Sequence, residues 1–147
     1  MDLFGGGKGE EDESLGNFES RNCQSRIGGN MKPEELRERT RRFALAVIKL
    51  VEGLPHSRVA DILGRQLLKS ATSVGANYRA ACKARSRADF ISKITIVEEE
   101  ADETQYWLEL LLYSDITGSS ALKEHLKEAR ELTAIFTASG KTARSSR

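Results

Sequence analysis

Apolar residues recur at three- and four-residue steps through most of this chain of 147 residues, and this spacing constrains the fold more than any other feature. A residue that returns every three or four positions stays on one side of an α-helix, so each run predicts an amphipathic helix. Four such runs occur, with chain breakers between them. Because helices joined by short connections pack antiparallel, the sequence predicts an all-α, up-and-down four-helix bundle over residues 32–140.

Local signals predict where the first three helices begin and end. Pro33 suits the first position of a helix, which we expect to end near Glu52. Ser57 can cap a second helix that ends near Lys83. The run Ser86-Arg87-Ala88-Asp89 has the pattern of a capping box, so it predicts the start of the third helix.

The remaining boundaries follow from glycine and from composition. We expect the third helix to stop at Gly118 and the fourth to begin near Ser120. Residues 1–31 are rich in glycine and acids with no apolar period, which predicts a disordered leader. Met31 is then a candidate for the true start of the compact protein. Residues 141–147 are predicted to be a basic disordered tail.

The predicted core consists of the residues that share one face of each helix. They are Leu36, Phe43, Val47, Leu50 and Leu54; Leu63, Leu67, Ser70, Val74, Asn77 and Ala81; Phe90, Ile94, Val97, Ala101, Thr104, Leu108 and Leu111; and Leu122, Leu126, Ala129, Phe136 and either Leu132 or Thr133. Small residues beside the second set predict the close approach of another backbone, for which packing within the bundle is the simplest reason. These are Ala60, Gly64, Ala71 and Gly75.

Composition narrows the class of protein. The formal net charge of +1 does not by itself predict a nucleic-acid partner, so any argument for one must come from local clusters of charge. Cys23 and Cys82 form no CxxC pair and cannot complete a zinc site, which favours a reducing cytoplasm. The longest strongly apolar run, residues 43–48, is far shorter than the roughly 20 residues that a membrane-spanning helix needs.

The sequence contains no convincing catalytic motif. Di-metal sites in four-helix bundles use Glu-x-x-His pairs, but neither His56 nor His125 follows a glutamate by three residues. Ser70 and Ser73 lack a GxSxG environment, and Cys82 lies near a helix end that does not stabilise a thiolate. We therefore expect a non-enzymatic protein without catalytic residues, metal or cofactor.

The second predicted helix carries bases on the side opposite its core face, and they continue into the following turn. No acid occurs between Asp61 and Asp89, and neutralising phosphates requires clustered bases of this kind. The residues, here named the basic stripe, are Arg58, Arg65, Lys69, Arg79, Lys83, Arg85 and Arg87. The basic stripe predicts binding of RNA or DNA; a solvated helix face is the competing interpretation.

The third predicted helix has acids and a second apolar row outside its core face. Large outward-facing aromatic residues mark interaction surfaces, so we expect a heterologous interface that closes a ring of subunits. The residues, here named the aromatic strip, are Ile96, Glu99, Glu103, Tyr106, Trp107 and Leu110. Two alternatives stay open: Trp107 completes its own bundle core, or the basic stripe of a neighbour covers the aromatic strip.

Residues 70–111, SATSVGANYRAACKARSRADFISKITIVEEEADETQYWLELL, resemble the four-helix-bundle proteins encoded in intervening sequences of bacterial 23S ribosomal RNA genes. The resemblance extends over about residues 43–136, and SVGAN at 73–77 and EADETQYWLELL at 100–111 are its most specific parts. It implies a four-helix bundle, a ring and no settled activity. Where the family pattern leads us to expect a lysine, this chain has Glu98-Glu99-Glu100, which argues against nucleic-acid contacts by this helix.

The same segment is more distantly similar to the accessory variability protein of diversity-generating retroelements. That similarity implies a homopentamer whose basic surface engages nucleic acid and a reverse transcriptase. Two functions are therefore expected for this chain. The first is a homo-oligomeric accessory protein that binds RNA or DNA through the basic stripe. The alternative is an assembly or scaffold module whose bases are matched by carboxylates of a neighbouring subunit.

Overall fold

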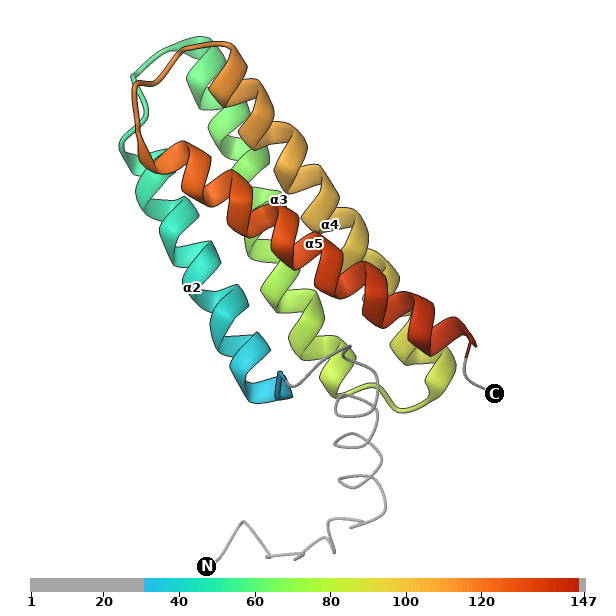
Figure 1. The fold of residues 1–147 in the computed structure, drawn as a ribbon. Coiled ribbons are helices and arrows are strands. Elements are labelled where there is room, and N and C mark those ends of the chain that lie inside the picture. The colour runs from blue at the N-terminus through green and yellow to red at the C-terminus, as the bar shows by residue number, and fades with distance from the viewer. Residues whose placement is uncertain (1–30, 146–147) are drawn as a thin grey trace, which may run out of the picture.

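The computed structural model describes residues 31–145, which form four long α-helices in sequential order (Figure 1). They are α2 (Pro33–Glu52), α3 (Arg58–Cys82), α4 (Arg87–Tyr113) and α5 (Ala121–Ser145). Consecutive helices run in opposite directions, and no strand occurs within residues 31–145. The predicted all-α, antiparallel four-helix bundle is thus confirmed. None of the four helices combines the length and apolarity that crossing a membrane requires.

Side-chain caps fix the starts of the helices as the sequence predicts. Pro33 occupies the first turn of α2. The Ser57 hydroxyl accepts a hydrogen bond from the Ala60 N–H at 3.1 Å, and the Ser86 hydroxyl accepts one from the Asp89 N–H at 3.0 Å. Each cap satisfies a backbone donor that a helix start leaves without an intrahelical acceptor. These two hydrogen bonds therefore determine the residues at which α3 and α4 begin.

The predicted end of the third helix is wrong by several residues. We expected it to stop at Gly118, whereas α4 ends at Tyr113 and the Ser114 N–H donates to the Leu110 carbonyl. The chain turns at Asp115, whose φ of 56° lies in the left-handed region. Aspartate tolerates that conformation better than most residues, so it terminates α4 before the glycine is reached.

The predicted disordered tail is wrong over residues 141–145, which continue α5. Ala143 is fully buried, and the Arg144 guanidinium donates to the Thr95 hydroxyl at 2.9 Å and to the Glu98 carboxylate at 3.0 Å. These contacts with α4 hold the last turn of α5 in place. The predicted leader lies outside the described residues except for Met31, which packs against the bundle core.

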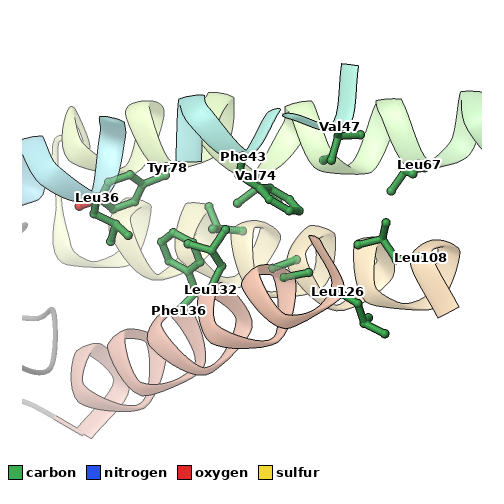
Figure 2. Packing of buried hydrophobic residues seen from close by; sticks show 14 of the residues in the cluster. Leu36, Phe43, Val47, Leu67, Val74, Tyr78, Leu108, Leu126, Leu132 and Phe136 are labelled. Atoms are coloured by element: carbon green, nitrogen blue, oxygen red, sulfur yellow. The ribbon is translucent and has the colours of Figure 1, made fainter. Parts of the chain in front are cut away.

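The core between the helices is built from the predicted faces, with two changes on α3. Leu63 and Asn77 are only half-buried, whereas Tyr78 is 1% exposed and packs on Phe136 with ring centroids 5.3 Å apart. Figure 2 shows these two rings in the core beside Leu132, which is buried where Thr133 is not. The inner face of α3 is therefore rotated by about one residue toward Tyr78.

The glycines of α3 allow α2 to approach closely. A Cβ atom at Gly75 would lie 3.2 Å from the Thr40 Oγ1 atom, and one at Gly64 would lie 3.1 Å from a methyl carbon of Leu54. Both distances are tighter than ordinary van der Waals contact, so larger side chains would separate the helices. The small residues of α3 thus serve packing within the bundle.

Two leucine truncations should separate the contribution of the core from that of the surface. Leu108 is fully buried and Leu45 is 53% exposed. Leu108→Ala should lower the free energy of unfolding by about 2–5 kcal/mol because it leaves a cavity. The same change at Leu45 should alter it by less than about 0.5 kcal/mol. Urea unfolding measures both, and equal effects would contradict the observed core.

Candidate nucleic-acid and assembly surfaces

Six members of the basic stripe are exposed. They are Arg58, Arg65, Lys69, Arg79, Lys83 and Arg85. The helical spacing places the first four on one side of α3, opposite its buried residues, as the sequence predicts. Lys83 and Arg85 lie in the connection to α4, and Lys83 lines a groove together with Arg79.

Carboxylates within the described part of the chain neutralise these six cations only in part, because Asp89 and Glu100 interact electrostatically with Arg85 and Lys69. None of the ion pairs formed among residues 31–145 includes one of them. Other bases do form ion pairs. The Arg39 Nε–H, for example, donates a hydrogen bond to the Glu128 carboxylate at 2.8 Å. That contact, opposed in part by burial, raises the pKa of Arg39. The six exposed bases are consequently available to an anionic partner.

Lys69 lies where the outer surface of α3 meets that of α4. It lowers the pKa of the Glu100 carboxyl electrostatically, but burial and the neighbouring Glu103 carboxylate outweigh it and raise that pKa overall. The two charged surfaces are therefore adjacent on one chain, and Lys69 and Glu100 interact electrostatically where they meet.

Arg87, the seventh member of the basic stripe, has a structural role. Its guanidinium donates to the Ala143 carbonyl at 3.1 and 2.8 Å and to the Arg144 carbonyl at 3.2 Å. Carbonyls in the last turn of a helix lack intrahelical donors, and a cation there also suits the helix dipole. Arg87 therefore caps α5 rather than joining the exposed surface.

A groove between α2 and α3 adds two bases that sequence analysis missed. It is open, holds about 560 Å³ and is lined by Arg37, Arg41, Arg79 and Lys83 beside the small residues Thr72, Gly75 and Ala76. Glu34 and Glu38 also line it, and they pair with Arg37 and Arg41 respectively. The four-residue step from Arg37 to Arg41 is the signal that could have placed both bases on one helix side.

The aromatic strip of α4 is partly exposed and partly joined to the bundle. Tyr106 is 53% exposed, and its ring lies edge-on to that of Trp107 at 5.1 Å. Trp107 is half-buried against the core, and its indole N–H donates to the Glu103 carboxylate at 3.1 Å. Trp107 thus contacts its own bundle and also contributes to the outer surface.

The other members of the strip differ in exposure. Ile96 is 38% exposed, Glu99 is exposed, and Leu110 is half-buried. Neither Glu99 nor Glu103 belongs to an ion pair among residues 31–145. The outer side of α4 therefore combines accessible aromatic surface with carboxylates that have no ion-pair partner in the described part of the chain.

Large apolar residues outside the aromatic strip are also exposed, and sequence analysis missed them. Their exposed fractions range from 39% to 76%, and they are Leu45, Ile48, Val59, Ile62 and Tyr113. Their positions do not follow the three- and four-residue spacing of the core residues in their helices, and this mismatch could have identified them as exposed.

The histidines and acids of the described residues do not gather as metal ligands do. No group of three His, Cys, Asp or Glu side chains within residues 31–145 could hold a metal ion. His125 is half-buried in a groove between α2 and α5 beside Phe43, and burial lowers its pKa. His56 is exposed and Cys82 is buried, both far along the chain from His125.

These observations define a small antiparallel bundle with a basic outer side on α3 and an acidic, aromatic outer side on α4. The sequence matches the model of the 23S rRNA-intervening sequence protein family over residues 34–138, and the chain belongs to that family. The search of curated proteins finds no match to the sequence.

A solved structure shares both sequence and fold with this chain. It is a protein from Bacteroides thetaiotaomicron, assigned to the S23 ribosomal protein family and described as having unknown function. The two chains are 34% identical, and the TM-score is 0.69 over 76% of this chain and all of the other. The similarity therefore extends over the whole Bacteroides protein.

Replacing Arg87 should loosen the end of α5. Arg87→Ala removes the hydrogen bonds to the Ala143 and Arg144 carbonyls, so the free energy of unfolding should fall by about 1–2 kcal/mol. Amide protons of the last turn of α5 should also exchange faster. Arg85→Ala removes an exposed arginine two residues away and should change neither measurement. If both variants behave alike, Arg87 does not cap the helix.

Proposed function

We propose that this protein is a non-enzymatic, homo-oligomeric accessory protein of the cytoplasm that binds RNA or DNA through the six exposed bases of the basic stripe. One observation carries the proposal: four of these cations share the outer side of α3, the other two follow directly in the connection to α4, and no carboxylate of residues 31–145 forms an ion pair with them. Such a surface attracts phosphates and releases their condensed counterions on binding.

The groove between α2 and α3 supports the proposal because it widens the basic surface. Arg37 and Arg41 face the same groove as Arg79 and Lys83. Their ion pairs with Glu34 and Glu38 are exposed, and exposed pairs of this kind contribute little energy. A phosphate backbone could therefore draw these arginines away from their carboxylate partners at small cost.

The family supports RNA as the first partner to test. The names of the matched family and of the Bacteroides relative refer to 23S rRNA and to a ribosomal protein family. The similarity to the accessory variability protein suggests a larger nucleic-acid machine, such as a reverse transcriptase, as a further partner. Direct readout of bases is not required for either role, because phosphate contacts position a protein without reading sequence.

A second function is favoured by the aromatic strip of α4. Tyr106 exposes half of its surface beside Trp107, and Glu99 and Glu103 have no ion-pair partner among residues 31–145. In this alternative, the bases of a neighbouring subunit meet those carboxylates, and the protein is an assembly or scaffold module. The basic stripe would then be covered in the oligomer.

Removing two lysines of the basic stripe should weaken nucleic-acid binding. Lys69→Gln combined with Lys83→Gln should lower affinity for RNA and reduce the slope of log affinity against log salt by about 0.7–0.9 per lost phosphate contact. Lys123→Gln with Lys127→Gln removes the same charge from exposed positions of α5 and should leave the slope unchanged. Fluorescence anisotropy at two salt concentrations measures both.

Two outcomes of that titration would contradict nucleic-acid binding through α3. The first is a wild-type protein whose RNA binding is absent or insensitive to salt. The second is an equal loss of affinity in the two double variants. Retained oligomerisation in either case would favour the scaffold alternative.

The oligomeric state tests the aromatic strip. We expect light scattering to give the mass of a homo-oligomer, and a pentamer is the state that the similarity to the accessory variability protein implies. Tyr106→Ser should shift the mass toward the monomer because it removes exposed aromatic surface at the interface. Tyr113→Ser truncates a ring that is 76% exposed outside the strip and should preserve the oligomer. A monomeric wild type would exclude this interface.

A further inference from the structure

The six exposed bases of the basic stripe fall into two groups separated by a stretch of α3 without charged side chains. The upper group, near the start of α3, is Arg58, Arg65 and Lys69, and the lower group is Arg79, Lys83 and Arg85. The step of ten residues from Lys69 to Arg79, the nearest members of the two groups, corresponds to about 15 Å along a helix that rises 1.5 Å per residue. Helix α3 therefore holds these two bases at a fixed separation.

Small uncharged residues cover the surface between the groups. Thr72 and Ala76 line the groove beside α2, and the Thr72 hydroxyl is bonded to the Leu68 carbonyl of its own helix. Ser73 is likewise bonded to its own helix through the Lys69 carbonyl. Between Lys69 and Arg79, α3 itself therefore carries no charged side chain, and the charges beside this stretch come from α2.

The stripe has no aromatic ring on which bases could stack. Tyr78, the aromatic residue of α3, is 1% exposed and packs on Phe136 within the core. The exposed rings within residues 31–145 are Tyr106 and Tyr113, and both belong to α4. Proteins that bind single strands stack the unpaired bases on aromatic side chains, a contribution that this surface lacks.

The basic surface around the lower group also extends onto a second helix. Arg37 and Arg41 of α2 face Arg79 and Lys83 across the groove, so cations occur there on two neighbouring helices. A duplex presents two rows of phosphates at a fixed distance across each groove. The major groove of B-form DNA is about 12 Å wide, and in A-form RNA the wide groove is the minor one. A separation of about 15 Å between the two groups is on that scale.

We infer that the ligand of this surface is a double-stranded nucleic acid, bound through phosphates on both sides of one groove. The upper group contacts one phosphate row, the lower group contacts the other, and the neutral middle of α3 lies over the groove between them. This inference rests on the proposed function and specifies its ligand. Because the contacts are to phosphates, duplexes of different sequence bind alike.

Fixed geometry explains why a single strand is the poorer ligand. A single strand carries one negative charge per 3.4 Å, whereas a duplex carries one per about 1.7 Å along its axis. A single strand must also lose conformational freedom to follow two groups of bases on a rigid helix, whereas a duplex already holds its phosphate rows apart. The arrangement of the cations therefore discriminates between the two.

The test compares four ligands of equal length with the full chain at two salt concentrations. They are a 20-base-pair RNA duplex, one RNA strand that cannot pair with itself, and the DNA forms of both. We expect both duplexes to bind at least about tenfold more tightly than either strand, with a steeper salt dependence. Single strands that bind as tightly as duplexes would overturn the duplex inference but leave nucleic-acid binding intact. Salt-insensitive binding, or none, would overturn both.

Two double variants test whether both groups are needed. Arg65→Gln with Lys69→Gln depletes the upper group, whereas Arg65→Gln with Arg79→Gln removes the same charge but takes one base from each group. The first variant should lose most of the preference for duplex over single strand, and the second should retain more of it. Equal preferences in the two variants would show that only total charge matters and would overturn contact by two separate groups.

Discussion

The packing of α3 against α4 is the contact on which the rest of the structure depends. At its centre the Thr104 hydroxyl donates to the Ser70 hydroxyl at 3.0 Å, and both side chains are almost fully buried. Fully buried Leu67 and Leu108 lie in the same interface. A buried hydroxyl must find a partner, so this pair fixes the register of the two helices as well as their separation. That register determines which side chains of each helix face outward.

With the register fixed, the opposite charges of α3 and α4 occupy neighbouring outer surfaces. Lys69 and Glu100 interact where these surfaces meet, but most of the bases and acids on the two helices have no ion-pair partner within residues 31–145. A single chain therefore displays a cationic and an anionic surface side by side. The same property suits phosphate binding by α3 and contact between subunits through α4.

Much of the fold could be predicted because helix periodicity and caps are local properties. The predicted faces of α2, α4 and α5 are buried, and the hydroxyls of Ser57 and Ser86 cap their helices. The predictions are wrong where a contact between residues far apart in the sequence determines the local structure. Tyr78 is buried in place of Asn77 because Phe136 of α5 offers it a ring to pack on. Residues 141–145 are helical because α4 supplies partners for Arg144.

For the candidate site, the sequence by itself determined that four bases share one side of α3 and that aromatic residues and acids share one side of α4, because a single helix sets each arrangement. Only the tertiary structure decided how those residues are used. Arg87 caps α5 through the Ala143 carbonyl, and Arg37 and Arg41 join the basic groove from another helix. These roles depend on which helices lie next to each other, and that placement follows from burial of the whole core rather than from local spacing.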